Sequence, residues 1–134
     1  MTEQQPTVAR SKETQVAGET TIDDGVLASI AGVAAREVEG VAGLGTSSVT
    51  TGLTERITGK DSRARGVMVE SGKKEAILDL TIKVIYGFSI PNIVAEVRQR
   101  VADRLLQMTG LQAKEINIKV VDIEFPERMP GRLE

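Results

Sequence analysis

The pattern of apolar and polar positions is clearest in residues 76–110, AILDLTIKVIYGFSIPNIVAEVRQRVADRLLQMTG. In the first half every second residue is apolar, which is the period of a strand with one face on a core. After Gly87 the apolar residues recur every three or four positions, which is the period of one helical face. Ser89 suits a helix N-cap, Pro91 a first turn and Gly110 a left-handed helix end. The pattern therefore predicts a strand, a tight corner and a helix, with these inward residues: Ala76, Leu78, Leu80, Ile82, Val84 and Tyr86 on the strand, and Ile90, Val94, Val97, Val101, Leu105 and Met108 on the helix.

An earlier helix is predicted over residues 24–39. Its apolar face consists of Leu27, Ile30, Ala31, Ala34 and Val38. Asp23 and Asp24 place carboxylates at the positive end of the helix dipole, and Gly40 is the expected stop. Paired carboxylates also suit general acid/base chemistry, but neighbours in a first turn point in different directions. The capping interpretation of the two acids is therefore favoured.

Two further strands are predicted. Residues 67–70 form a short strand that leads through SGKK, a hairpin-turn composition, into the long strand, so these two strands should be antiparallel neighbours. Residues 115–125, EINIKVVDIEF, form the last strand, and their apolar phase changes at Val120 and Val121. Either a β-bulge shifts the register there, or both faces of the strand are partly covered.

Together these elements predict an α+β fold in two layers, a mainly antiparallel sheet of three to four strands with both helices on one face. The last strand lies either antiparallel beside the short strand or beside the long strand through a right-handed crossover, and the pattern leaves both open. We expect a disordered N-terminal tail over residues 1–18, one domain over 19–125 and a C-terminal tail over 126–134.

Residues 40–66 are rich in Gly, Ser and Thr, and a short strand near 47–51 is one interpretation of them. The fragment GVAG at 40–43 fits the GXXG loop of RNA-binding KH domains, although it contains no basic residue. The most basic stretch of the chain follows, formed by Arg56, Lys60, Arg63 and Arg65. This candidate basic loop is either a solvated loop or a docking patch for an acidic partner or a phosphate.

The amino-acid composition limits the kinds of catalytic and metal sites that the chain could form. His and Cys are absent, which excludes disulfides, thiol nucleophiles, imidazole catalysis and His/Cys zinc sites. An enzyme would have to rely on carboxylates, hydroxyls, Lys60, Lys73, Lys74 and Tyr86, which form no recognisable constellation. We therefore expect no catalytic residues, no cofactor and no metal. A net charge of −2 and an aromatic content of 2% also speak against nucleic acid as a partner.

No stretch has the pattern of a signal peptide or of a membrane span. We therefore expect a soluble protein that does not insert directly into a membrane and reaches one only through a partner. The outward row of the predicted sheet is more informative, because it carries several apolar residues: Ile77, Ile85, Val121, Ile123 and Phe125. An apolar patch of that size is typical of association. We expect this candidate interaction face to pack against a second copy, a partner or the segment 46–60.

Five pieces of sequence carry a resemblance to a known family. They are ETTIDDGVLASIAGVAAREVEGVAGL, Gly66-Val67 before the hairpin, DLTIKVIYGFSIPNIVAEVRQRV, the helix end MTGL, and INIKVVDIEF. In this order they resemble the alkaline-shock, Gls-type envelope stress response family of Gram-positive bacteria. The resemblance covers about residues 18–125, and the loop 45–65 departs from it by being unusually basic and polar.

The resemblance implies a small, non-enzymatic cytoplasmic protein that is abundant under envelope stress. It also implies a homo-oligomer that a small membrane-anchored protein partner holds at the inner face of the cell membrane. The resemblance supplies no catalytic or ligand-binding residues. The alternative is a small α+β RNA-binding module, which rests on the helix and strand order, the GVAG fragment and the basic loop.

Overall fold

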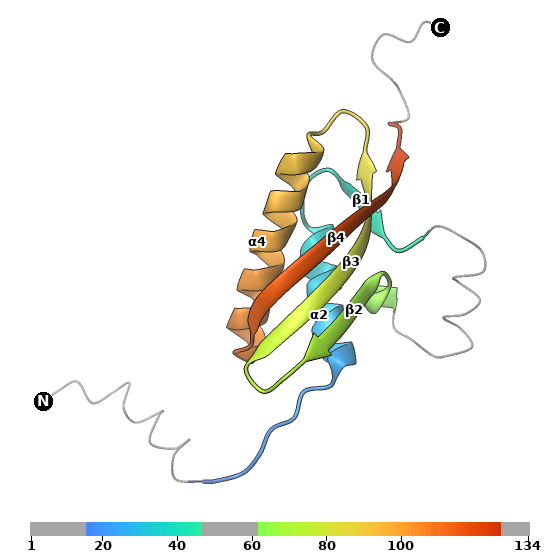
Figure 1. The fold of residues 1–134 in the computed structure, drawn as a ribbon. Helices are drawn as coiled ribbons and strands as arrows, with labels where there is room; N and C mark the ends of the chain where they lie inside the picture. The colour runs from blue at the N-terminus through green and yellow to red at the C-terminus, as the bar shows by residue number, and fades with distance from the viewer. Residues whose placement is uncertain (1–15, 47–61, 127–134) are drawn as a thin grey trace, which may run out of the picture.

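Strand β3, Glu75–Ile85, is the centre of the sheet in the computed structural model, which describes residues 16–46 and 62–126 (Figure 1). Strands β1 (Val41–Leu44) and β2 (Val67–Ser71) both pair antiparallel with β3, one after the other along the same edge. Strand β4 (Gln112–Glu124) pairs with the whole length of β3 in parallel. The predicted fold class is confirmed, and of the two arrangements left open the chain adopts the one with β4 beside β3.

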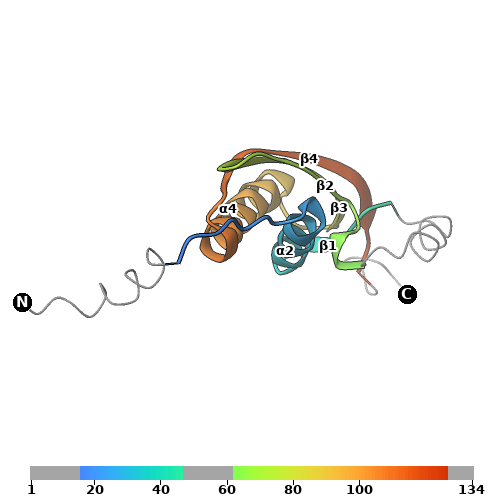
Figure 2. The same ribbon diagram turned by 90° about the horizontal axis from the view of Figure 1, so that it is seen from below.

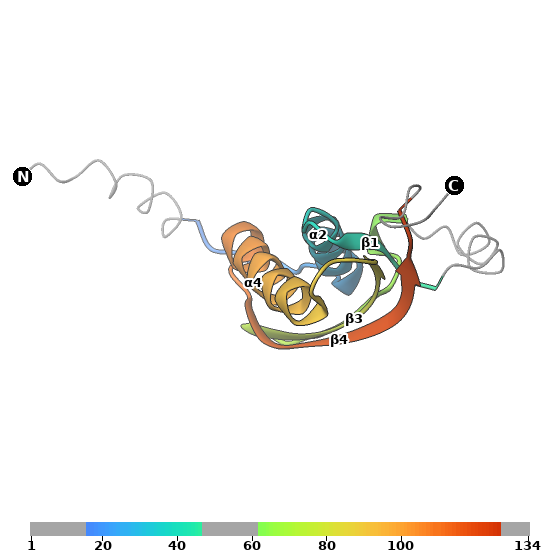
Figure 3. The ribbon, with the colours of Figure 1, turned by 90° about the horizontal axis from the view of Figure 1, so that it is seen from above.

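Two helices complete the fold, α2 (Asp24–Arg36) and α4 (Ile90–Thr109), with a short 3₁₀ turn, η1, at Ser62–Ala64. Both helices lie against the concave face of the curved sheet (Figures 2 and 3). The convex face carries no helix from the described part of the chain. The predicted two-layer arrangement is therefore present, with the core between the helices and the concave face.

The core consists mainly of the predicted inward rows. On β3 the five residues from Ala76 to Val84 at every second position are buried, whereas Tyr86 lies beyond the strand end and is 44% exposed. On α4 the buried row repeats every four residues: Ile93, Val97, Val101 and Leu105. The prediction was wrong for Ile90 and Met108, which are exposed because they lie in the first and last turns, beyond the ends of that row.

The ends of α4 follow the predicted chemistry. The Ser89 hydroxyl accepts a hydrogen bond from the Asn92 N–H at 3.3 Å. Gly110 has a left-handed φ of 80°, and its N–H donates to the Leu106 carbonyl. Helix α2 ends at Arg36, three residues before the predicted end, because the last N–H groups bond three residues back and tighten the turn.

The phase change in the last strand is a β-bulge. Ile82 pairs with Val120, but Lys83 pairs with Asp122, so Val121 is an extra residue. A second irregularity makes Lys114 extra between Ala113 and Glu115. The predicted strand near 47–51 lies outside the described residues; the strand observed in this region is β1, at 41–44.

Candidate interaction surfaces

The five residues of the candidate interaction face do not share one face of the sheet. Residues that pair across a parallel ladder point to the same side, and Ile123 pairs with Val84, which belongs to the buried inward row. Phe125 follows in the same phase, and its ring contacts Tyr86 edge to face, with centroids 5.0 Å apart. The extra residue at Val121 therefore turns the last two apolar residues toward the concave side.

Ile77 and Ile85 do lie on the convex face, but they are far apart. They stand eight residues apart on one strand, which corresponds to about 26 Å at roughly 3.3 Å per residue. Polar side chains fill the space between and beside them: Asn117 donates to the Asp79 carboxylate at 2.9 Å, and Lys83 lies 3.9 Å from Glu124. The continuous apolar convex face that we expected from the sequence is therefore absent, because the bulge removes two of its members.

Exposed apolar side chains gather instead at the end of the sheet where β3 and β4 finish and α4 begins, at the top of Figure 1. Their exposed fractions range from 38% to 58%. We call this group the apolar end, and it consists of Tyr86, Phe88, Ile90, Val121, Ile123 and Phe125. It contains all three aromatic residues of the chain.

The apolar end combines residues that the sequence pattern assigned to different elements. Tyr86 and Ile90 had been placed in the core rows of a strand and a helix, and Phe88 in the corner between them. Phe88 lies over Gly40, where an added Cβ would stand only 3.1 Å from its ring. The sequence feature that could have predicted the apolar end is the YGFSI corner, because a turn does not need two aromatic residues for its own conformation.

The structure describes half of the candidate basic loop. Arg56 and Lys60 lie outside the described residues. Arg63 is in η1, and its carbonyl accepts a hydrogen bond from the Arg36 guanidinium at 2.9 Å. The aliphatic part of the Arg65 side chain packs over Gly45. A docking role for these four residues stays a prediction.

The GVAG fragment forms part of strand β1. Val41 and Leu44 pair with Val84 and Ile82, and the Gly40 carbonyl accepts from the Ile85 N–H at 2.9 Å. A GXXG clamp needs its backbone free to approach a nucleic-acid strand. Because this backbone is committed to the sheet, the fragment no longer supports the RNA-binding interpretation.

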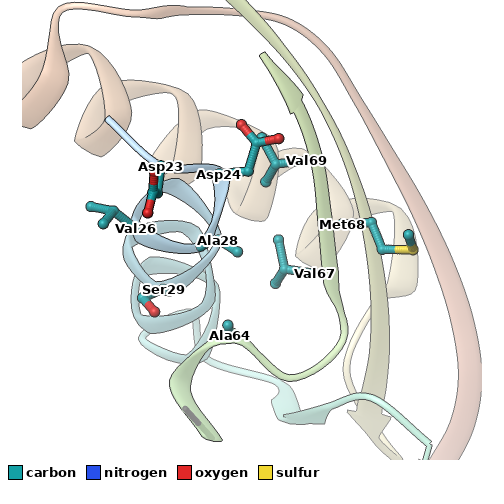
Figure 4. A pocket seen from close by; sticks show the side chains of 10 residues that line it. Asp23, Asp24, Val26, Ala28, Ser29, Ala64, Val67, Met68 and Val69 are labelled. Atoms are coloured by element: carbon teal, nitrogen blue, oxygen red, sulfur yellow. The ribbon is translucent and has the colours of Figure 1, made fainter. Parts of the chain in front are cut away.

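An open hollow of about 520 Å³ separates the first turns of α2 from β2 (Figure 4). Its walls are mostly apolar, with the carboxylates of Asp23 and Asp24 and the Ser29 hydroxyl at its margin. The Asp24 carboxylate accepts a hydrogen bond from the Ser71 hydroxyl at 2.6 Å, which ties α2 to β2. Asp23 is the N-cap residue, although its side chain makes no capping bond. These contacts support the structural interpretation of the acid pair.

A second open hollow lies between residues 19–22 and the β2–β3 turn, with Glu19 and Lys73 in its wall. Within the described ranges, no three Asp or Glu side chains come together as a metal site.

The strongest charge cluster links the two helices. The Glu37 carboxylate accepts a hydrogen bond from the Arg104 guanidinium at 2.6 Å and lies 3.5 Å from that of Arg100. The Arg104 hydrogen bond, assisted by Arg100, lowers the pKa of Glu37, and the same bond raises the pKa of Arg104. All three side chains are partly exposed, and their contacts join the end of α2 to α4.

The chain is similar to proteins of two Gram-positive bacteria. It is 39% identical over 108 residues to the protein YqhY of Bacillus subtilis, covering 81% of this chain and 78% of that protein. It is 34% identical over 113 residues to a protein of Streptococcus pyogenes named stress response regulator gls24 homolog. That match covers 84% of this chain but 63% of the streptococcal protein, so the relative is considerably longer than the shared domain.

A solved structure of the MamM CTD also matches, with a TM-score of 0.43 and 12% identity over 72% of this chain and 92% of that one. These values are too low to bear on function. No helix in residues 16–46 and 62–126 is long and apolar enough to cross a membrane.

A protein-family model matches residues 12–125, which is nearly the whole chain. The family takes its name, Asp23, from a protein and not from the residue Asp23 discussed above, and it is described as having a cell envelope-related function. With the resemblance to the Gls-type relatives, this match confirms the assignment made from the five sequence pieces. The chain belongs to the Asp23 family, whose function is related to the cell envelope.

Proposed function

We propose that this chain is a non-enzymatic interaction module of the cell-envelope stress response. In this proposal it associates with itself, and a membrane-anchored protein partner holds it at the cytoplasmic face of the membrane. The family description and the name of the streptococcal relative support the envelope stress role. The absence of His and Cys from the chain supports a role without catalysis.

The observation that carries the interaction role is the apolar end. Phe125 is 58% exposed and Ile123 is 42% exposed, although both point to the core side of the sheet. Burying an apolar side chain of this size contributes about 1.5–3 kcal/mol. We propose that an apolar segment on the cytoplasmic side of the anchored partner covers these side chains together with Tyr86 and Phe88.

This surface replaces the convex face that the sequence suggested. Val121, Ile123 and Phe125 keep their proposed role in association, and Ile85 adjoins them at the end of β3. Ile77 lies at the opposite end of the strand and takes no part in the proposed contact.

The test is recovery of the partner from detergent-solubilised membranes of a cell that produces the protein. The bait is the tagged full chain with Ile123→Asp or Phe125→Asp. The matched control is Met68→Asp, which makes the same kind of change at a side chain that is 71% exposed on β2. We expect both end variants to lose about tenfold or more in recovery, since each tenfold corresponds to about 1.4 kcal/mol.

Recovery that is equal for the two end variants and the wild type, with all variants folded by circular dichroism, would contradict the proposal. Loss of recovery in the Met68 variant as well would show that the contact is not confined to the apolar end.

A further inference from the structure

The outer edge of β4 is the second unpartnered feature of the fold. β4 pairs with β3 along one edge, and no other strand of the described residues pairs with its other edge. At 13 residues it is the longest strand in residues 16–46 and 62–126, and a long edge with no strand beside it is a template for strand addition unless something covers it. Its inner row, Ile116, Ile118 and Val120, is only partly buried, while the adjacent row of β3 is fully buried.

The direction of the backbone groups on this edge follows from two hydrogen bonds. The Ile116 carbonyl accepts from Arg98 Nε at 2.9 Å, and the Ile123 N–H donates to the side chain of Asp122 at 2.8 Å. Both groups therefore point away from β3. Because alternate residues of a strand turn their backbone groups to opposite edges, Ile118 points outward like Ile116. Between the bulges at Lys114 and Val121, the stretch 115–120 is regular and has no strand beside it, and pairing with a second copy requires the Arg98 side chain to leave the Ile116 carbonyl or to share it.

The side chains of this stretch are complementary to themselves. Glu115, Asn117 and Lys119 lie on the convex face, because they pair with Ile77, Asp79 and Thr81 of β3. When two copies pair antiparallel about a two-fold axis at Asn117, Glu115 of each copy lies opposite Lys119 of the other. The same register places Ile116 opposite Ile118 on the concave side and aligns their outward N–H and C=O groups.

Neighbouring registers with the same backbone alignment are less favourable. If the two-fold axis lies at Lys119, Lys119 of one copy lies opposite Lys119 of the other. If the axis lies at Ile118, Glu115 lies opposite Val121 and has no basic residue across from it. Opposite charges across a strand pair stabilise it, and like charges destabilise it. The charge pattern therefore selects a single register with a second copy as the occupant.

We propose that the chain forms a symmetric dimer in which the two β4 strands pair antiparallel about Asn117, joining two sheets into one continuous sheet. This inference rests on the self-association contained in the proposed function and specifies its surface. The paired stretch 115–120 contains no residue of the apolar end, which begins on β4 at the bulge residue Val121. The dimer can therefore present two partner-binding ends at once.

The test uses charge exchange in the full chain, with molar mass measured by light scattering after size exclusion. Glu115→Lys places Lys opposite Lys119 of the other copy, and Lys119→Glu places Glu opposite Glu115, so each variant alone should shift to monomer. An equimolar mixture of these two variants should form a heterodimer, because every pair then joins Lys with Glu. The double variant should also return to a dimer. Lys114→Glu is the matched control, since it makes the same charge change at the neighbouring bulge.

Wild-type protein that is monomeric at the concentrations tested, or single variants that keep the wild-type mass, would overturn the inference. So would a mixture that stays monomeric while each variant is folded. Partner recovery in the Phe125→Asp experiment is a separate readout. If the charge variants keep the wild-type mass but Phe125→Asp loses the partner, the β4 pairing is wrong and membrane recruitment through the apolar end stands.

Discussion

At the scale of single residues, Gly32 shows how closely the elements approach. It lies in the middle of α2 and is buried, and a Cβ at this position would overlap the Arg63 carbonyl oxygen of η1. The Arg36 guanidinium binds the same carbonyl, so the helix and the 3₁₀ turn are joined by one contact and one hydrogen bond. Gly32 therefore leaves room for the backbone of η1, and a larger side chain at this position would have to push η1 away from α2.

Gly32→Ala is expected to destabilise the fold, because the new methyl group must displace η1 from α2. Gly25→Ala is the matched control in the same helix, since nothing lies within 4 Å of a Cβ there. That change should be neutral or stabilise by about 0.5–1 kcal/mol, the usual helix preference for alanine. Urea unfolding of both variants is the measurement. Equal effects of the same sign would contradict the packing described for Gly32.

Glu37 provides a pH-dependent prediction. Its pKa in the folded state is lowered, chiefly by the Arg104 hydrogen bond, so its ionised form is favoured by folding. The stabilisation is present above the ordinary pKa of 4.5 and is lost as the pH falls below it. Glu37→Gln should therefore reduce stability relative to wild type at pH 7, and this difference should shrink near about pH 3. The effect should be small, because exposed ion pairs contribute little.

Denaturant unfolding at both pH values measures this difference. Glu39→Gln is the control, as it removes a carboxylate from the same segment outside the Glu37 cluster. A wild-type advantage over Glu37→Gln that is independent of pH would contradict the ionic origin of the contact.

At the scale of elements, the bulge in β4 decides which surface is apolar. Without the bulge, Val121 would pair with Lys83 in a regular ladder, and Ile123 and Phe125 would lie on the convex face beside Lys83 and Ile85. With it, Phe125 reaches Tyr86 and the apolar side chains gather at one end of the sheet. A single inserted residue therefore separates a polar convex face from an apolar end.

Deletion of Val121 and Asp122 together is expected to move Phe125 away from Tyr86, because Ile123 then pairs with Lys83 and Phe125 turns to the convex face. Tyr86 is the only tyrosine of a chain without tryptophan, so the near-UV circular dichroism band of tyrosine reports on its packing. The band should fall in the deletion variant to about the level of Phe125→Leu. Val121→Ala keeps the bulge and should leave the band unchanged. An unchanged band after the double deletion would contradict the register described for this end of β4.

Element prediction from sequence succeeded where the signal is local. The period of β3, the Ser89 cap and the Gly110 stop of α4 were all readable from short stretches, and the structure confirms them. Strand β1 was missed, because Val41–Leu44 is short and contains a glycine, and it owes its conformation to pairing with β3. The bulge was one of two stated alternatives, but its consequence depends on the register with β3, which is a non-local pairing.

At the scale of the whole molecule, the fold separates two kinds of surface. Helices α2 and α4 occupy the concave face (Figure 3). The convex face is mainly polar, and six of the twelve exposed large apolar side chains of the described residues form the apolar end. The five residues first suggested as an interaction face were partly the right ones, since Val121, Ile123 and Phe125 are exposed. Their common face could not be predicted, because it follows from the bulge and from where the helices end.

The most direct measurement of the central claim is site-specific photo-crosslinking in living cells. A benzophenone amino acid replaces Phe125 in one version of the full chain and Met68 in a matched control, and adducts are separated by mass and identified. We expect an adduct with a membrane-anchored protein from position 125 and none from position 68. An adduct of equal yield from both positions, or no membrane-protein adduct from position 125 in cells that contain the folded protein, would contradict the account.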